Sequence, residues 1–336
     1  MDTKPFVFHR MGRRKAVSGL ISMGLFPSFV YSGESYTQQK LYRESEPQTP
    51  FTYCLNTSTI MGQKLDISRE IKLAAAAGYE GIEIWIRSLQ QYVDGGGSLR
   101  TLAQFIQDQG IRVENAIGFA PWIVDNNDAR SKGLDQAKRE MDMLAQIGCK
   151  RIAAPPAGAT QGIPLALDRV AERFRTLMDL GVEMGVIPQL EIWGFSKNLH
   201  TLSQVLYVAS ACGHPDTRIL PDVYHLYKGG SDFDGLKLLN GHAVDIFHIN
   251  DYPLAPSRTE IQDKDRVYPG DGAAPLNTIL QDLATAQSPI ILSLELFNRS
   301  YWEQDPLAVA RTGLQKMKDA VESSKTASTG EKKGEQ

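Results

Sequence analysis

Four short apolar segments in the last third of the chain each end in a side chain that can bind a divalent metal ion. These residues are Glu191, Asp222, His248 and Glu295. Three carboxylates and one imidazole provide mostly oxygen ligands, which suit Mn²⁺, Mg²⁺ or Co²⁺, and such a mixed set also binds Zn²⁺. Three carboxylates held close together without a cation would repel one another. We therefore expect one divalent metal ion, with Mn²⁺ favoured.

Each of these residues taken alone has a simpler interpretation. A single carboxylate after an apolar segment is more often a solvated strand end or a helix cap than a metal ligand. Four such ends in succession are hard to assign to chance. The metal interpretation also requires a fold that brings the four ends together.

The segments before and between these residues predict that fold. The expected strands are residues 51–56, 81–85, 111–117, 151–154, 187–192, 218–223, 243–249 and 290–296. The expected helices are residues 66–77, 99–109, 129–147, 164–184, 201–211, 234–239, 276–286 and 306–321. Eight strand and helix pairs over roughly 270 residues predict an α/β protein with a (β/α)₈ TIM barrel. An open doubly wound sheet is the alternative, but no Gly-x-Gly-x-x-Gly motif follows the first strand.

The carboxyl ends of the parallel strands in such a barrel meet at one face. Glu191, Asp222, His248 and Glu295 fall at the ends of strands five to eight, so neighbouring strands would bring them together. A metal ion there could bind a substrate carbonyl and hydroxyl and stabilise the enediolate formed when the adjacent carbon loses a proton. Glu191 and Glu295 are the candidate catalytic acid and base. Proton return would give epimerisation or isomerisation, and loss of a β-leaving group would make the enzyme a lyase.

The two ends of the chain differ in composition from the predicted barrel. Residues 1–33, with Arg13 and Arg14 before a mildly apolar stretch, resemble a twin-arginine export signal, which predicts a periplasmic or exported protein. If the arginines belong instead to a disordered tail, the protein is cytoplasmic. We expect a linker at 34–50, the catalytic barrel at 51–323 and a disordered tail at 324–336.

Charge and cysteine content exclude several classes of protein. The formal charge of −3 and the pI near 6.1 provide no basic field for nucleic acid. The apolar stretch near the amino end is too short for a stable membrane span. Three well-separated cysteines suggest buried thiols rather than a disulfide framework. A homo-oligomer formed through the outer helices is an open expectation, because no exposed apolar stripe marks an interface.

Several motifs carry a resemblance to a known family. They are Glu191-Ile-Trp-Gly, Asp222-Val-Tyr-His, His248-Ile-Asn-Asp and the segments 265–272 and 294–299. Together, over residues 51–322, they resemble the xylose-isomerase-like sugar isomerase and epimerase superfamily, and within it the inosose isomerases. The resemblance implies a metal-dependent isomerase or epimerase that acts on a small sugar or keto-cyclitol. It also implies that the four predicted ligands hold the metal, and that Glu191 and Glu295 exchange the proton.

Three further residues are candidates for substrate binding. By the resemblance, His225 and Arg266 match positions that contact substrate oxygens. His225 could otherwise be a proton relay or a core histidine, and Arg266 could pair with acidic neighbours on a solvated loop. Trp193 could form an apolar wall against a sugar ring or could pack over the end of the barrel.

Two positions depart from the pattern of the relatives. Tyr227 stands where inosose isomerases have a second histidine, and Lys197 stands where some ketose epimerases have a glutamate that binds the sugar. Both departures leave the accepted sugar open. Glu83 and Glu114, in the second and third expected strands, are interpreted as hydrogen-bonded structural carboxylates.

Three other functions compete with an isomerase. An apurinic-site endonuclease of the same superfamily would need histidines from early strands, but no histidine occurs between His9 and His200. A non-catalytic sugar-binding barrel would not need the two carboxylates Glu191 and Glu295. An exported 3-keto-glycoside lyase or epimerase uses the same first proton transfer and suits an extracytoplasmic location.

Overall fold

The computed structural model describes residues 50–239, 242–285 and 289–331, with side chains to residue 326 in the last range. The export signal expected at 1–33 and the linker expected at 34–50 lie outside these residues, apart from residue 50 at the end of the linker. The first strand begins at Phe51, where the sequence predicted the start of the folded domain.

Eight short parallel strands form the centre of the domain. They are β1 (Phe51–Asn56), β2 (Gly81–Trp85), β3 (Arg112–Ile117), β4 (Arg151–Ala154), β5 (Ile187–Glu191), β6 (Arg218–Leu220), β7 (Ile246–Ile249) and β8 (Ile290–Leu294). Strands β3-β2-β1-β8-β7 form one hydrogen-bonded set and β4-β5-β6 the other. The isolated parallel bridge between Asp222 and His248 joins β6 to β7.

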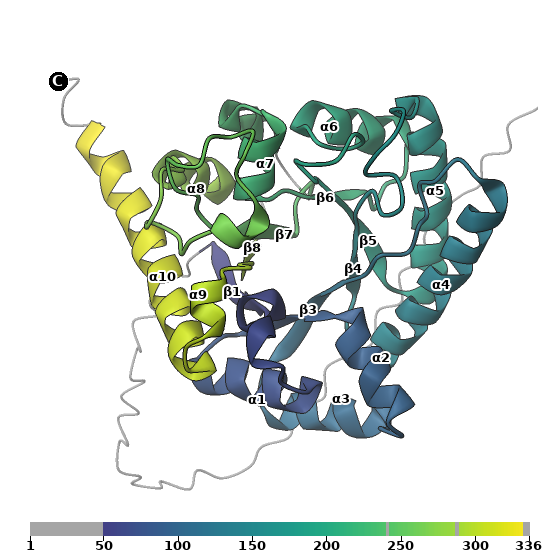
Figure 1. Ribbon diagram of the computed structural model, residues 1–336, viewed down its shortest axis with the longest axis horizontal. Coiled ribbons are helices and arrows are strands. Elements are labelled where there is room, and N and C mark those ends of the chain that lie inside the picture. The colour runs from purple at the N-terminus through teal and green to yellow at the C-terminus, as the bar shows by residue number, and fades with distance from the viewer. Residues whose placement is uncertain (1–49, 240–241, 286–288, 332–336) are drawn as a thin grey trace, which may run out of the picture. The chain divides into compact units, whose positions relative to one another are not determined.

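Helices follow the strands and surround them (Figure 1). The α-helices are α1 (Ile67–Ala77), α2 (Ile86–Asp94), α3 (Leu99–Asp108), α4 (Asn127–Gln146), α5 (Leu167–Met184), α6 (Leu202–Ala211), α7 (Val223–Gly229), α8 (Leu276–Ala284), α9 (Arg299–Trp302) and α10 (Pro306–Glu331). Three 3₁₀ helices complete the described part: η1 (Thr57–Gln63), η2 (Phe233–Leu238) and η3 (Asp263–Asp265). The arrangement confirms the predicted (β/α)₈ barrel.

Apolar side chains fill the domain on both sides of the strands. The larger core lies between strands and helices, so strands such as β8 are buried along their whole length. A smaller cluster fills the interior of the barrel, with one residue from each of six strands: Cys54, Ile117, Ala153, Leu220, Ile246 and Ile291. This filling makes the barrel a packed core rather than a pore, so a site can form only at an end of the strands.

Two helices near the predicted site were not expected from the sequence. Helix α2 follows β2 without a loop, and α7 begins immediately after Asp222, which is its N-cap. The Asp222 carboxylate accepts the amide proton of His225 at 2.7 Å, and this cap stabilises a helix too short to show clear periodicity. The helix expected at 234–239 is the 3₁₀ helix η2.

The carboxyl end of the described chain also differs from expectation. Residues 324–331, expected to belong to a disordered tail, continue helix α10 to Glu331. Ser324 is buried, and its carbonyl oxygen accepts a hydrogen bond from the Gln281 side chain of α8 at 2.7 Å. Tertiary contact therefore extends a helix that polar composition alone would end. Residues 332–336 lie outside the described part.

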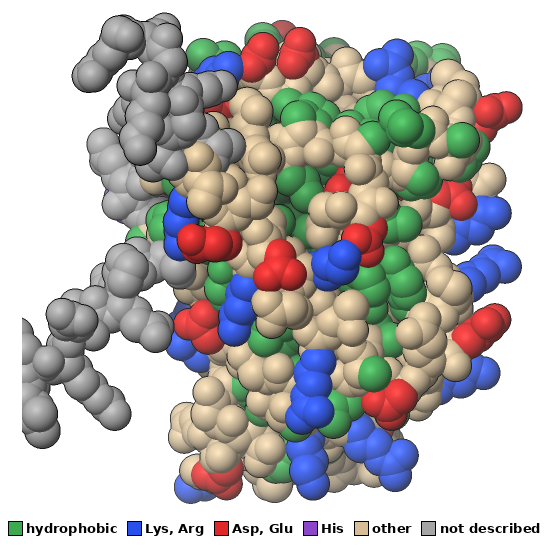
Figure 2. Space-filling view, turned by 90° about the vertical axis from the view of Figure 1, so that its left-hand side faces the viewer, with side chains coloured by type: hydrophobic (Ala, Val, Ile, Leu, Met, Phe, Trp, Pro, Cys, Tyr) green, Lys and Arg blue, Asp and Glu red, His purple; other side chains and the backbone are tan. Residues whose placement is uncertain are grey.

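The surface agrees with the composition. On the face of the molecule that carries α10, Lys and Arg side chains are interspersed with Asp and Glu (Figure 2). None of the described helices combines the length and the apolar character that crossing a membrane requires.

Candidate metal centre

The barrel brings the four predicted ligands to the carboxyl ends of strands five to eight. Glu191 is the last residue of β5, Asp222 lies two residues after β6, His248 lies within β7, and Glu295 follows β8 directly. All four side chains are buried.

The three carboxylates converge on one atom of the fourth residue, Nδ1 of His248. Its distances are 3.2 Å to Glu295 Oε2, 3.7 Å to Asp222 Oδ2 and 3.9 Å to Glu191 Oε1. One ligand atom each from Asp222, His248 and Glu295 lie within 4.8 Å of one another. Glu191 lies at the edge of this group.

Glu83 of β2 holds His248 from the other side of the imidazole ring. The His248 Nε2 atom lies 3.0 Å from Glu83 Oε2 and 3.1 Å from Oε1. Glu83 also accepts hydrogen bonds from Asn56 at 2.8 Å, Asn115 at 2.6 Å and Ser293 at 2.6 Å. Glu83 acts as an acceptor for all these donors. We therefore place the ring proton of His248 on Nε2, so that Nδ1 faces the three carboxylates.

Asp222 is fixed by donors on both of its oxygens. Oδ1 accepts the His225 amide of α7, while Oδ2 accepts from Asn250 at 3.0 Å and from Arg266 at 3.0 Å. The spacing Asp222-x-x-His225 is therefore that of a helix cap and its third helical residue. The same residue follows strand β6, caps helix α7 and belongs to the proposed ligand set.

The donor set fits a divalent cation. Four buried carboxylates, of Glu83, Glu191, Asp222 and Glu295, surround His248, and Arg266 is the one buried guanidinium in contact with them among the described residues. This leaves an excess of buried negative charge, which is unfavourable without a further cation. In addition, His248 Nδ1 and Glu191 Oε2 are buried and have no hydrogen bond of acceptable geometry. Both atoms are of types that bind metals.

The two outer carboxylates have opposite electrostatic environments. Burial raises the pKa of Glu191 well above its usual value, despite the nearby His248. Burial would also raise the pKa of Glu295, but His248 and Arg266 outweigh burial and hold that pKa below its usual range. For His248, the carboxylates of Glu295 and Glu83 outweigh burial and raise the pKa. The centre thus holds two carboxyl groups with different proton affinities.

Arg266 is buried in the centre and contacts two of the predicted ligands. Nη1 donates to Glu295 at 2.8 Å as well as to Asp222, and Nη2 donates to Asp263 at 2.6 Å. The guanidinium lies over the rings of Tyr224 and Phe297, at 4.4 and 5.1 Å. Its Nε is buried and unpartnered. Arg266 therefore pairs with an acidic neighbour, Asp263, but it is buried rather than solvated.

His225 lies between Arg266 and the loop after β5. Its Nε2 is 3.0 Å from Arg266 Nη2, and its Nδ1 is 3.3 Å from the amide nitrogen of Gly194. Both neighbours are donors, so a neutral imidazole can accept only one of them, and the shorter contact assigns the lone pair to Nε2. Burial and Arg266 lower the pKa of His225 to about 3, although Asp222 acts in the opposite direction.

A cavity of about 210 Å³ opens over the centre. Glu191, Glu295, His225 and Arg266 line it, whereas Asp222 and His248 lie beneath. Aromatic rings surround its mouth, with contacts between neighbours at centroid distances of 5.2 to 6.1 Å: Trp85, Phe119, Trp193, Phe195 and Phe297. Trp193 therefore lines the cavity, and its contact with a sugar ring stays a prediction.

Several residues of the centre were not identified from the sequence as functional. Glu83 is the hydrogen-bonded carboxylate that was expected, but its contact with His248 was not foreseen. Asn56, Asn250 and Asp263 were missed, because single polar residues in loops or strands carry no distinctive pattern. For Glu83, the available signal was its place at the end of an apolar strand, the same feature that marked the ligands. Tyr227 stands where inosose isomerases have a histidine. Its ring stacks on that of Tyr252 with a centroid distance of 3.8 Å, and it does not line the cavity.

Comparisons with known proteins agree with this geometry. A family model described as xylose isomerase-like TIM barrel matches residues 71–320. Inosose isomerase of Bacillus velezensis is 27% identical over 258 residues, which cover 74% of this chain and 90% of that protein. The 3-dehydroshikimate dehydratase of Pseudomonas putida is 24% identical over 242 residues, which cover 70% of this chain but 36% of that protein.

Solved structures share the fold. The one described as the IOLI protein with a binding zinc atom superposes with a TM-score of 0.73 at 23% identity, covering 80% of this chain and 98% of that one. The matched family model spans most of the barrel, including all four predicted ligands. The chain therefore belongs to the family of xylose isomerase-like TIM barrels.

Proposed function

We propose that this protein is a metal-dependent isomerase or epimerase of a sugar or keto-cyclitol, which acts by proton transfer through an enediolate. The observation that carries the proposal is the convergence of three buried carboxylates on the unpartnered Nδ1 of His248, directly beneath a cavity. The inosose isomerase relatives support the substrate class.

In this proposal, Glu191, Asp222, His248 and Glu295 hold one divalent ion, with Mn²⁺ favoured. Mg²⁺, Co²⁺ and Zn²⁺ also suit the ligands, and the zinc in the related solved structure supports such an ion. When bound, the ion supplies Lewis-acid stabilisation of negative charge on the substrate oxygens. Asp222 and His248 lie beneath the cavity and serve as ligands only.

Glu191 and Glu295 line the cavity and transfer the proton. One carboxylate takes the proton from the carbon next to the carbonyl, and the other returns a proton to the substrate. Glu191 has a free oxygen, Oε2, whereas Glu295 accepts from Asn56 at 3.2 Å and from Arg266. Return of the proton to the same carbon gives epimerisation. Delivery of the proton to the neighbouring carbon moves the carbonyl group along the substrate.

His225, Arg266 and Trp193 bind the substrate in this proposal. Arg266 places a positive charge beside the oxygens that become negative, and its free Nε can donate a hydrogen bond. His225 is neutral and buried, so it orients Arg266 and contacts substrate hydroxyls. Trp193 covers an apolar face of the ring.

Elimination from the same enediolate is the second candidate, as in a 3-keto-glycoside lyase. The 3-dehydroshikimate dehydratase relatives favour this outcome, because their names describe loss of water. The export proposed from the twin arginines suits an extracytoplasmic glycoside. Release of an aglycone would distinguish elimination from isomerisation.

Solvent exchange tests the proton transfer directly. The purified protein with Mn²⁺ is incubated in deuterium oxide with a panel of ketoses, inososes and 3-keto-glycosides. We expect deuterium at the carbon next to the carbonyl of at least one substrate, read by NMR. Metal binding without exchange on any substrate would instead indicate a sugar-binding barrel.

Replacement of one carboxylate tests the division of roles. We expect Glu295→Gln to remove most turnover while some metal affinity remains, because the amide oxygen can bind a metal but the group cannot carry the proton. Steady-state kinetics and metal titration measure the two effects. Glu303→Gln, at an exposed position, is the control. Near-normal turnover of Glu295→Gln would contradict the two-carboxylate mechanism.

A further inference from the structure

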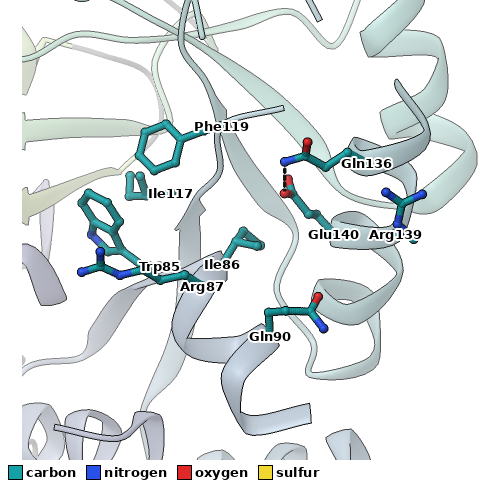
Figure 3. Close-up of a pocket in the computed structure, with 9 residues that line it drawn as sticks. All are labelled: Trp85, Ile86, Arg87, Gln90, Ile117, Phe119, Gln136, Arg139 and Glu140. Carbon is teal, nitrogen blue, oxygen red and sulfur yellow. Dashed lines mark hydrogen bonds between the residues drawn. The ribbon is translucent and has the colours of Figure 1, made fainter. Parts of the chain in front are cut away.

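A second cavity, of about 450 Å³, lies beside the one over the metal centre. It is formed by the ends of β2 and β3 and by helices α2 and α4 (Figure 3). Trp85, Ile117 and Phe119 line both cavities, so the two spaces adjoin at these three side chains. We refer to the space over the metal centre as the inner cavity and to the second space as the outer cavity.

The inner cavity alone is small for a complete substrate. Its volume of about 210 Å³ lies below the range of ~300 to 1,000 Å³ that is typical of ligand sites. The inner and outer cavities together fall within that range. A ligand longer than one sugar ring would therefore use both.

The dividing wall is held by the metal centre itself. The Trp85 indole N–H donates to Asn56 Oδ1 at 3.3 Å, and the Asn56 amide donates to Glu83 and Glu295. Phe119 packs against Trp85 with a centroid distance of 5.3 Å, yet 39% of it is exposed. The wall thus presents fixed aromatic surfaces beside both cavities, and such surfaces bind the apolar faces of sugar rings.

Polar groups of α4 line the opposite side of the outer cavity. Gln136 and Glu140 extend from the helix into this space (Figure 3), and the Gln136 amide donates to Glu140 Oε1 at 2.7 Å. Glu140 is only 6% exposed, and its other oxygen, Oε2, has no hydrogen-bond partner. This oxygen is enclosed by the protein beside Gly118, so on this side of the outer cavity a hydroxyl group of a ligand can reach the Gln136 amide.

Cationic and amide groups lie on the α2 side of the outer cavity. The Arg87 guanidinium lies over the Trp85 ring at 5.0 Å, and Gln90 lies one helical turn further along α2. The outer cavity therefore combines flat apolar surfaces with hydrogen-bonding side chains. This combination matches a sugar ring, which has apolar C–H faces and polar hydroxyl edges.

We propose that the outer cavity is a second sugar subsite, which binds a ring joined by a glycosidic bond to the ring held at the metal centre. The substrate is then a disaccharide-like glycoside rather than a free monosaccharide. Trp85 and Phe119 contact both rings, and Gln136, held in place by Glu140, forms hydrogen bonds with the outer ring. This inference rests on the proposed function, because it assigns the other ring to the metal centre.

Equilibrium binding to the full-length, Mn²⁺-loaded protein tests the subsite. The probes are glucose and four glucose-containing disaccharides, namely cellobiose, maltose, sucrose and trehalose, measured by titration calorimetry. We expect at least one disaccharide to bind about tenfold more tightly than glucose. We also expect Gln136→Ala to weaken that disaccharide about fivefold and to leave glucose binding unchanged.

Matched variants distinguish the loss of a ligand contact from a general loss of protein stability. Gln146→Ala removes an equivalent pairing on the same helix, since Gln146 donates to Asp142 at 2.9 Å, but it lies away from both cavities. We expect Gln146→Ala to bind every probe like the unmodified protein. Gln90→Ala, at an exposed position of α2, should weaken the disaccharide as Gln136→Ala does.

Two results would overturn the subsite. One is that no disaccharide binds more tightly than glucose, and the other is that Gln136→Ala weakens glucose and the disaccharide equally. These results are distinct from failure of the proposed function. Disaccharide preference without any solvent exchange would contradict the proton transfer alone, whereas exchange on monosaccharides without disaccharide preference would contradict the subsite alone.

Discussion

His248 shows how one residue acquires its role from its neighbours. Its imidazole is placed between Glu83 on the Nε2 side and three carboxylates on the Nδ1 side. A histidine that binds a metal commonly donates its other ring proton to a carboxylate, which fixes the ring and the tautomer. Glu83 occupies that position, and its three other donors keep it in place.

Removal of this carboxylate should therefore weaken metal binding without removing a ligand. We expect Glu83→Gln to reduce metal affinity about 10- to 100-fold, because the amide presents both a donor and an acceptor to four donors. Titration of the metal-free protein with Mn²⁺ measures the effect.

A second buried carboxylate provides the control. Glu114→Gln alters a residue of β3 that pairs with Arg112 and Arg151 and has no contact with His248. This variant should lose stability but retain metal affinity. Equal metal affinity of Glu83→Gln and the unmodified protein would show that Glu83 does not orient His248.

At the scale of elements, helix α7 carries His225 to the site and depends on close backbone contact. A Cβ atom at Gly194 would lie 2.4 Å from the carbonyl oxygen of His225 and 2.7 Å from the amide nitrogen of Gly229. The loop after β5 therefore packs directly on the backbone of α7. Glycine is required at this position by the contact, not by its backbone angles.

Gly194→Ala should displace α7 from the loop. We expect a loss of about 1 to 3 kcal/mol in the free energy of unfolding, together with weaker substrate binding as His225 moves away from Arg266. Urea denaturation and KM measure the two effects. Gly95→Ala, where the nearest atom to the new Cβ would be 3.3 Å away, is the control and should change the KM little. An unchanged KM for Gly194→Ala would show that the position of α7 does not affect substrate binding.

At the scale of the whole barrel, the metal centre joins strands that are otherwise weakly connected. Strands β6 and β7 meet through the bridge between Asp222 and His248, two of the proposed ligands. A metal bound to both residues would hold the two hydrogen-bonded sets of strands together. Metal binding should therefore contribute to the stability of the fold as well as to the chemistry.

Chelation tests this contribution. A ligand at 100 times its Kd stabilises the folded state by about 2.7 kcal/mol, and for a domain of this size each kcal/mol shifts the Tm by roughly 2 to 4 °C. We expect a chelator to lower the Tm by about 5 to 10 °C, and Mn²⁺ to restore it, as measured by calorimetry. Asp222→Asn should reduce this response, because an amide oxygen binds the metal more weakly than a carboxylate, while α7 is kept, because asparagine caps helices as well as aspartate does. An unchanged Tm after verified metal removal would contradict the stabilising role.

The sequence by itself determined the fold class and the four converging residues. Alternation of apolar strands with helices indicates a parallel barrel. In a parallel barrel the carboxyl ends of β5 to β8 lie at one face, and this follows from the fold alone. Glu191, Asp222, His248 and Glu295 could therefore be identified from their places along the chain. The family motifs added the expected sugar or keto-cyclitol chemistry.

Only the tertiary structure decided how these residues are paired and what surrounds them. The contact of Glu83 with His248 spans 165 positions, and the Arg266 contacts with Asp222 and Glu295 depend on the path of a loop. The outer cavity depends on α4 and on α2, a helix that was not expected from the sequence. Strand and helix patterns reflect local burial, whereas pairing between distant side chains and the shape of a cavity follow from packing, which no local pattern encodes.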